Sequence, residues 1–521
     1  MNNYKSIQQT CWIVTFFAFF LLGIGGASLV QAAENKEPVT IEGPTTIEQA
    51  FENLTTGDRS DKKAAIHFLM QHRDVSLLPK LEEIRLDVDR RTRRLLTPLI
   101  KLLSNQINLA SPNSDVRRGA ARDIGLRGSQ DALPLLEEAL AKESAKWVRY
   151  EMEEAISLIR LEAEDQSIRV AAIQKLGELR SANALPVLTE ILQATNNEPD
   201  QQAISNAATE AIDHIESWQT FAHAVETTLR GISLSSVLLI MAMGLAIVFG
   251  LMGVINMAHG EMMMVGGYAT FVIQELFRAY MPESMFDYYY AIAIPGSFLA
   301  AGLIGYILEV TLIRFLYGRP LETLLLTWGV GLIMIQSARI TFGDLTSVQA
   351  PALLRGSAQV AVGIQLPYNR IFVVILAIVA VIGIYWILFR TPAGLRVRAV
   401  MQNREMSSCL GIPTRKLDSL TFAFGSGMAG LAGSALTLIG NVEPEMGRQY
   451  IVDSFMVVVT GGVGKLAGTI SAAFGLGMLN KYLEPFAGAV YGKVFILLLI
   501  ILFLQYRPAG LFAMKGRYAD S

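Results

Sequence analysis

The sequence predicts an all-α protein in which a secreted helical-repeat domain precedes a polytopic bundle of membrane-crossing helices. The first observation is a contrast in charge along the 521 residues: Glu34–Arg230 holds 56 charged residues in 197 positions, and Gly231–Ser521 holds 33 in 291. The second is a contrast in pattern. Apolar residues recur every three or four positions in the first part, whereas the second alternates long uncharged runs with short charged loops.

The N-terminus, residues 1–33, has the pattern of a secretory signal peptide. Lys5 precedes an uncharged run from Trp12 to Val30, and small residues surround Ala32 before the first acidic residue, Glu34. An uncleaved anchor helix is the alternative, although glycines shorten the strongly apolar part of the run. Either form delivers the following segment to the same side of the membrane, outside the cytoplasm.

Residues 34–220 are predicted to form a helical-repeat domain. Asp115–Leu140 aligns with Ser167–Leu192 at an offset of 52 residues, which places Gly125 on Gly177 and Pro134 on Pro186. A helix pair with proline at the start of its second helix resembles HEAT-type repeats, whose helices bury their apolar faces by stacking. Such solenoids carry partner-binding surfaces more often than chemistry, so we expect a scaffold or docking surface.

Residues 221–517 are predicted to cross the membrane about nine times, within a range of seven to ten. A helix needs roughly 20 apolar residues to span the hydrocarbon core, so the shorter runs are candidates for half-helices. The uncharged runs are 231–260, 291–308, 371–389, 419–442, 454–464, 466–480 and 494–506, with shorter ones at 262–274 and 323–338.

Basic residues predict the orientation of this bundle. The loop Arg390–Lys416 carries six basic residues and one acid, Glu405, and the C-terminal tail is basic as well. Both are expected in the cytoplasm. With the repeat domain outside, the number of crossings has to be odd.

Several classes of function are disfavoured. The net charge of −2 includes no basic block for a nucleic-acid backbone, so no nucleic-acid partner is expected. Two cysteines far apart, Cys11 and Cys409, and five scattered histidines offer no metal site. We expect no cofactor and no enzymatic activity in this chain.

Two nucleotide-like motifs have better explanations. Gly425–Gly430 spells G-x-G-x-x-G but lies in an uncharged membrane run, where Gly425, Ala429 and Gly433 recur every four positions and favour close helix packing. Gly464-Lys465 resembles the end of a P-loop, yet the leading glycine and the hydroxyl residue that it requires are missing. ATP binding by this motif is therefore not expected.

Polar residues at the end of an apolar run mark a candidate solute path. Asn256, His259 and Glu261 close a 30-residue apolar run, and polar groups at membrane depth usually face a bundle interior or an aqueous pathway. The competing interpretation is an interfacial cap, in which these residues meet the headgroups.

The surrounding segment GLAIVFGLMGVINMAHGEMMMVGGY resembles the signature of permease subunits in the branched-chain amino-acid family of ABC importers. The Leu-Glu-Thr-Leu-Leu-x-Thr-Trp-Gly segment, together with the secreted helical extension, resembles the urea-type branch of that family. The repeat domain is absent from the general family pattern, so its role cannot be carried over. Further stretches that resemble the family are Arg319–Gly329, Arg390–Gly411, Gly461–Gly468 and Arg507–Phe512.

The resemblance implies a permease subunit that translocates urea across the bacterial inner membrane, with a periplasmic N-terminal domain. The implied partners are a second homologous permease, two ATP-binding subunits that hydrolyse ATP, a periplasmic solute-binding protein and membrane lipid. It also implies an ATPase coupling loop between Arg390 and Lys416, in which helical spacing would group Val397, Val400 and Met401 on one face. The coupling residues are Gly394, Arg396, Val397, Arg398, Val400, Met401, Arg404, Glu405 and Gly411.

Urea is small, neutral and planar, so its path needs paired hydrogen-bond donors and acceptors and no fixed counter-charge. A zwitterionic amino acid would favour a charged or helix-terminus partner for each end. Candidate path residues are Asn256, His259, Glu261, Glu322, Thr323, Thr327 and Trp328. Glu322 has a second interpretation, as a helix-start residue after Pro320.

Two alternatives remain open. The same architecture could carry branched-chain amino acids or short-chain amides. A protein of another class, a membrane-anchored scaffold or sensor, would use the repeats to bind a partner and the helices only as an anchor, although an anchor needs far fewer crossings.

Overall fold

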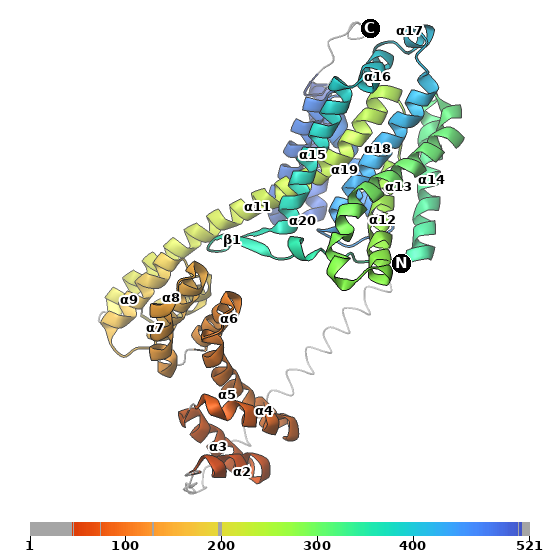
Figure 1. Ribbon diagram of the computed structural model, residues 1–521. Helices are drawn as coiled ribbons and strands as arrows, with labels where there is room; N and C mark the ends of the chain where they lie inside the picture. The colour runs from red at the N-terminus through yellow and green to blue at the C-terminus, as the bar shows by residue number, and fades with distance from the viewer. Residues whose placement is uncertain are drawn as a thin grey trace, which may run out of the picture. The chain divides into compact units, whose positions relative to one another are not determined.

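A computed structural model describes residues 44, 46–72, 74–127, 130–195, 201–508 and 510–512. The predicted signal peptide, residues 1–33, lies outside the described residues. The chain divides into two compact units, and the helix α11 (Gln202–Met252) runs from the first into the second (Figure 1). Of the described residues, those up to 179 and those within 186–211 form the first unit, and those within 180–185 and from 212 onward form the second.

The first unit is built from helix pairs. Asp89 and Asn113 cap the starts of α5 and α6 through their side chains, and prolines stand in the first turns of α4, α7 and α10. Its elements are α2 (Ile47–Thr56), α3 (Arg59–His72), η1 (Val75–Leu77), α4 (Leu78–Asp87), α5 (Arg90–Leu109), α6 (Ser114–Gly125), η2 (Gln130–Ala132), α7 (Leu133–Lys142), α8 (Lys146–Arg160), α9 (Gln166–Leu179), η3 (Ala182–Ala184) and α10 (Leu185–Thr195).

The repeat predicted from sequence has a structural counterpart within this unit. A Cβ atom at Gly125 would lie 2.6 Å from the Cα of Ala155, and one at Gly177 would lie 3.0 Å from the Cα of Ala211. Gly125 therefore lets α8 approach α6 closely, and Gly177 lets α11 approach α9 in the same way. Leucine, isoleucine and alanine side chains fill the cores between the helix pairs.

The second unit is a bundle of helices. Among the described residues, five helices are long and apolar enough to cross a membrane: α11, α13, α14, α15 and α20. The elements from α12 onward are α12 (His259–Tyr280), η5 (Glu283–Tyr288), α13 (Tyr289–Thr311), η6 (Ile313–Leu316), α14 (Pro320–Phe342), η7 (Ala352–Leu354), α15 (Tyr368–Arg390), α16 (Pro392–Gln402), α17 (Arg404–Cys409), α18 (Thr414–Thr437), α19 (Met446–Gly461) and α20 (Leu466–Tyr506).

Small residues bring the central helices together. A Cβ atom at Gly425 would lie 2.8 Å from the carbonyl oxygen of Gly244 on α11, and one at Gly433 would overlap the carbonyl oxygen of Met263 on α12. Ala429 is fully buried against Met262 and Ala301. The row of small residues thus lies where α18 meets its neighbours, as close packing without a hydrophobic driving force requires.

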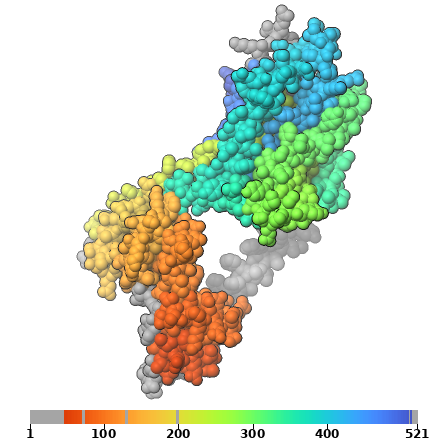
Figure 2. All heavy atoms as spheres, in the orientation of Figure 1, coloured from red at the N-terminus to blue at the C-terminus, as the bar shows by residue number. Residues whose placement is uncertain are grey.

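The outside of the bundle is apolar. Figure 2 shows the side chains of α13 and α15 on the surface of this unit, where Leu303 and Trp386 are exposed. The helix α20 is interrupted at Gly488 (φ 73°), and a Cβ atom at Gly492 would lie 3.7 Å from the Cβ of Leu483. The chain therefore folds back on itself within α20, and its two halves are separate helices.

Two ends of the bundle can be distinguished (Figure 1). At one end, the antiparallel hairpin of β1 (Ser357–Ala361) and β2 (Ile364–Pro367) lies beside α11, because the Trp218 indole N–H donates to the carbonyl oxygen of Val362 at 2.9 Å. At the other end, α15 leads into α16 and α17, and α20 ends at Tyr506. The sequence did not predict the hairpin.

Candidate functional site

The chain between α11 and α12 turns back into the bundle. Residues 253–258 are not helical, and Gly253 takes a positive φ of 62° directly after α11 ends. The His259 Nε2 atom then lies 3.2 Å from the carbonyl oxygen of Met241. Because Met241 precedes the end of α11 by about 16 Å at 1.5 Å per residue, α12 begins deep inside the bundle.

The helix α14 holds this returning segment in place. The backbone N–H of Met257 donates to the Thr327 hydroxyl at 3.1 Å, and that hydroxyl donates to the carbonyl oxygen of Thr323 at 2.8 Å. A Cβ atom at Gly331 would lie 3.0 Å from the Cδ of Glu261. Glu261 is therefore packed on the same face of α14.

A second helix begins at the same place. Residues 438–445 separate α18 from α19, and Val442 in this segment forms a β-bridge with Thr346. Gly260 and Gly447 are each the second residue of their helix, and a Cβ atom at Gly260 would lie 2.6 Å from the carbonyl oxygen of Gly447. Neither α12 nor α19 has a side-chain cap, so two partly positive N-termini meet inside the bundle.

Polar side chains without partners lie at this junction. Asn256 and His259 are fully buried and Glu261 is 5 % exposed. Both amide atoms of Asn256, the Nδ1 of His259 and the Oε2 of Glu261 have no hydrogen-bond partner in the described part of the chain. Since buried polar groups are normally paired, these four atoms are the ones available to a polar solute.

The hydrogen-bonding roles of these atoms follow from chemistry. Nε2 of His259 faces a carbonyl oxygen, which can only accept, so Nε2 carries the proton and Nδ1 of the neutral ring is an acceptor. When ionised, the Glu261 carboxylate also only accepts, and Asn256 offers one oxygen and one NH2 group. The junction therefore presents three acceptor atoms, one amide donor and the N–H groups of two helix ends.

A polar cavity of about 690 Å³ lies at the far end of α12. The stacked rings of Tyr268 and Phe342, whose centroids are 4.3 Å apart, lie between that cavity and the junction. Glu261, Tyr268 and Glu275 are spaced by seven residues and so share one face of α12, which faces α14. The cavity is lined by Phe271, Gln274, Glu275, Arg278, Phe342, Leu345, Thr346, Ser347 and Gln349.

The seven predicted path residues are thus divided among three positions. Asn256, His259 and Glu261 lie at the junction, and Thr323 and Thr327 are buried beside it with their hydroxyls donating to backbone carbonyls. Glu322 and Trp328 lie on the outer face of α14, where Glu322 accepts from Arg319 at 3.2 Å and Trp328 is 49 % exposed. The structure does not bring these last two residues to the junction.

The predicted coupling loop forms two helices. Asn403 ends α16 and caps α17 by accepting from the N–H of Met406, so Arg404 and Glu405 belong to a different helix from Val397, Val400 and Met401. Gly411 has a positive φ of 81° just after α17, and Gly394 lies against the carbonyl oxygens of Ile387 and Leu388. Val400 is buried, whereas Arg396 and Glu405 are exposed.

A buried ionic network behind this loop was missed by sequence reasoning. Arg404 pairs with Asp418, and the buried Glu309 accepts hydrogen bonds from Ser419 and from the Tyr317 hydroxyl. Burial, together with the nearby Asp418 and Glu309, raises the pKa of Tyr317, which keeps the hydroxyl protonated as a donor. The charged residues stand at the ends of apolar runs, where they were indistinguishable from interfacial residues.

Comparison with known proteins assigns the second unit. The family described as "Branched-chain amino acid transport system / permease component" matches residues 227–504, and the HEAT repeat family matches residues 97–157. Both resemblances drawn from the sequence are thereby confirmed at the level of family. The described ranges contain no cluster of three His, Cys, Asp or Glu side chains that could hold a metal ion.

Several transport proteins are similar to this unit. The chain is 27 % identical over 295 residues to the high-affinity branched-chain amino acid transport system permease protein BraD of Pseudomonas aeruginosa, covering 56 % of this chain and 95 % of BraD. It is 26 % identical over 303 residues to LivH of Escherichia coli, covering 56 % and 96 %. The probable branched-chain amino acid transport permease LivH of Methanocaldococcus jannaschii is 26 % identical, with 53 % and 89 % covered. No solved structure matches the chain.

Proposed function

Because the chain belongs to the permease family of branched-chain amino acid transport systems, we propose that it is the permease subunit of an ABC importer that carries urea across the bacterial inner membrane. Two ATP-binding subunits would supply the energy. A second homologous permease and a periplasmic solute-binding protein would complete the importer. The proposal of urea as the cargo rests on the unpartnered polar atoms at the junction of α12 and α19.

The polar atoms of the junction complement urea. Urea has four N–H donors and one carbonyl acceptor, and the junction offers acceptors on Asn256, His259 and Glu261. The Asn256 side-chain amide can pair with urea through two parallel hydrogen bonds, since each partner has one C=O and one NH2 group. The N–H groups at the start of α12 suit the urea carbonyl oxygen, whereas at the start of α19 the N–H groups of Met446 and Arg448 already donate to the carbonyl oxygens of Glu443 and Glu445.

Branched-chain amino acids are the alternative cargo, and two observations favour them. The similar proteins are named as branched-chain amino acid permeases. In addition, two helix N-termini suit a carboxylate, and Glu261 could receive an ammonium group. Glu261→Gln separates the two cargoes: it removes the counter-charge of an ammonium group but keeps an oxygen that accepts from urea.

The test measures uptake of labelled urea and labelled leucine in a urease-free strain that lacks this chain. The strain is complemented with the wild type, Asn256→Leu, Glu261→Gln or the control Asn480→Leu, which changes a half-buried residue of α20. We expect urea uptake to return with the wild type and the control, to fall at least tenfold with Asn256→Leu, and to fall less with Glu261→Gln. Urea uptake that persists without the chain, or leucine uptake that depends on it, would overturn the urea assignment.

The arrangement of helices supports nine crossings with the basic loop in the cytoplasm. The passes are α11, α12, α13, α14, α15, α18, α19 and the two halves of α20. The hairpin beside α11 and the helices α16 and α17 lie at opposite ends of the bundle (Figure 1). With α16 and α17 proposed to be cytoplasmic, the hairpin end of the bundle is periplasmic, and so is the repeat domain that precedes α11 in the chain. Reporter fusions after Cys409 are expected to be cytoplasmic, and a periplasmic signal would contradict this topology.

Exposed apolar residues on α16 and α17 support a docking role. Leu395, Met406 and Leu410 are 61, 57 and 78 % exposed at the end of the bundle that carries the basic loop. Apolar side chains among cations are suited to a partner protein in the cytoplasm. A membrane-anchored scaffold does not need such a cytoplasmic surface. If no ATP-binding subunit co-purifies with α16 and α17, the result would favour the scaffold over the permease.

A further inference from the structure

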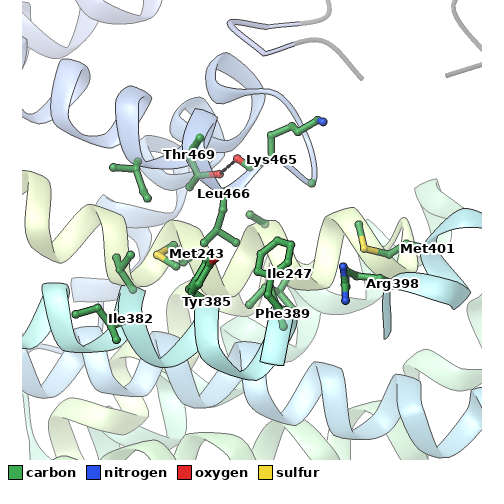
Figure 3. Close-up of a pocket in the computed structure, with 16 residues that line it drawn as sticks. Met243, Ile247, Ile382, Tyr385, Phe389, Arg398, Met401, Lys465, Leu466 and Thr469 are labelled. Carbon is green, nitrogen blue, oxygen red and sulfur yellow. Dashed lines mark hydrogen bonds between the residues drawn. The ribbon is translucent and has the colours of Figure 1, made fainter. Parts of the chain in front are cut away.

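An apolar groove lies apart from the polar junction, between α11, α15, α16 and the beginning of α20 (Figure 3). It encloses about 610 Å³. Its walls include Met243 and Ile247 from α11, Ile382, Tyr385 and Phe389 from α15, and Leu466 from α20. None of the residues of the predicted solute path lines it.

The groove opens toward the apolar perimeter of the bundle. Ile382 and Tyr385 line it, yet they are 60 and 53 % exposed, and both belong to a helix that is apolar along its length. An occupant can therefore enter sideways from the surrounding bilayer. A water-soluble solute would gain little from such walls, because a polar molecule loses hydration there without receiving partners.

One end of the groove is cationic. Arg398 and Lys465 are the charged residues among those that line it, and no acidic residue is among them. Lys465 is exposed, and its side chain extends outward from the groove in Figure 3. The Arg398 guanidinium lies 5.0 Å from the centre of the Phe389 ring, and its buried Nε has no hydrogen-bond partner in the described part of the chain. This end is the one where α15 passes into α16, at the predicted cytoplasmic surface.

An apolar groove that opens to lipid and ends in two cations matches the shape and charge of one kind of molecule. We propose that the groove binds an anionic phospholipid of the cytoplasmic leaflet, with an acyl chain along α15 and the phosphate on Arg398 and Lys465. The unpaired Nε of Arg398 donates to a phosphate oxygen, and the guanidinium remains stacked on Phe389. Basic pockets at this depth are a recurrent mode of lipid headgroup recognition.

The bound lipid would act on the helices of the basic loop. Arg398 and Met401 both belong to α16, so the lipid ties this helix to α15 and to the start of α20. Anionic lipid is therefore expected to stabilise the position of α16, which belongs to the surface that we assign to ATPase docking. The inference rests on α15 lying in the membrane, but it does not depend on the cargo.

The test counts bound lipids by native mass spectrometry on the purified full-length protein, released from detergent after titration with phosphatidylglycerol or with phosphatidylethanolamine of the same acyl chains. The wild type is expected to retain one phosphatidylglycerol in preference to phosphatidylethanolamine. Each cation contributes about fivefold to affinity, so Arg398→Gln with Lys465→Gln should weaken phosphatidylglycerol binding by about 25-fold.

Two further variants separate the groove from general charge effects. Arg396→Gln removes an exposed cation from the same helix and is the matched control, because Arg396 does not line the groove. It is expected to leave phosphatidylglycerol binding unchanged. Ala467→Trp fills the apolar part of the groove without altering charge, and it should weaken binding of phosphatidylglycerol as well.

Three results would overturn the proposal. Equal retention of the two lipids by the wild type would do so without any variant, which keeps the test valid if a variant fails to fold. Equal loss of binding in Arg396→Gln and in the double variant would show a diffuse charge effect. Photo-crosslinking from position 382 to the second permease, or to residues 12–30 of this chain, would show that a protein segment fills the groove.

Discussion

The contact between Gly260 and Gly447 gives the sharpest prediction about the junction. In Gly260→Ala the new Cβ would lie 2.6 Å from the carbonyl oxygen of Gly447 and 3.3 Å from the Cβ of Ile451. Reaching an ordinary separation requires α12 and α19 to move apart by about 0.8 Å. Overpacking of this kind costs about 1–3 kcal/mol, and the better helix propensity of alanine offsets up to about 1 kcal/mol of it.

The consequence for transport should exceed the consequence for stability. Gly260 stands between His259 and Glu261, so a displacement of the helix start moves the polar atoms that we assign to the solute. A misplacement of about 1 Å can cost on the order of 100-fold in a positioned site, and we expect urea uptake to fall at least tenfold. A cost of about 1–2 kcal/mol is small enough for the protein to insert and accumulate.

The assay pairs uptake of labelled urea with the amount of protein in the membrane fraction. Gly475→Ala is the matched control, because a Cβ at this position in α20 meets no atom within 4 Å. We expect the control to transport like the wild type. If Gly260→Ala transports normally at normal abundance, the meeting of the two helix ends has no part in the solute path, and the reasoning fails.

Three further predictions concern other parts of the molecule. Arg404→Gln leaves the buried carboxylate of Asp418 without its partner, which costs about 1–3 kcal/mol of local stability. Hydrogen exchange in α17 should speed up at least tenfold, whereas Arg415→Gln, at an exposed cation, should leave it unchanged. Arg396→Glu should uncouple ATP hydrolysis from transport in a protein that still inserts, and normal transport by this variant would place the docking surface elsewhere. In the repeat domain, hydrogen bonds from Arg117 lower the pKa of Glu143. The stabilisation that this carboxylate provides is therefore full above its usual pKa of 4.5 and is lost as pH falls through the lowered pKa. Hydrogen exchange in α7 and α8 should report this loss, and Glu143→Gln should flatten the pH dependence.

Local sequence signals predicted what depends on local physics. Uncharged runs predicted membrane helices because each backbone polar group in lipid has to be satisfied within its own segment. Asn256, His259 and Glu261 were identified because burial of polar groups in an apolar run is costly. The 52-residue repeat predicted the pairing of helices in the first unit, where Gly125 and Gly177 take equivalent roles.

Features that depend on distant parts of the chain were not predictable. The sequence near Gly260 does not indicate that Gly447 is its neighbour, and the sequence near Glu309 does not indicate that Ser419 donates a hydrogen bond to it. Along α14 the apolar residues surround the helix, so the sequence could not show that Thr327 and Gly331 face inward and Trp328 outward. The break between α16 and α17 at Asn403 was not predicted, because in the sequence a capping asparagine looks the same as a polar residue inside a helix.

Two interruptions in the helices explain how a bundle poor in charge can hold a polar solute. Residues 253–258 and 438–445 are not helical, and each segment is followed by a helix that starts inside the bundle without a side-chain cap. Uncapped N–H groups would be costly in lipid, so they are tolerated only where a cavity or a ligand can receive them. These donors can serve a urea carbonyl, but the partly positive helix ends suit a carboxylate better, so they do not select urea. Discrimination therefore has to come from the acceptors on Asn256, His259 and Glu261, which is why the substitutions that report the cargo lie there and not at the helix ends.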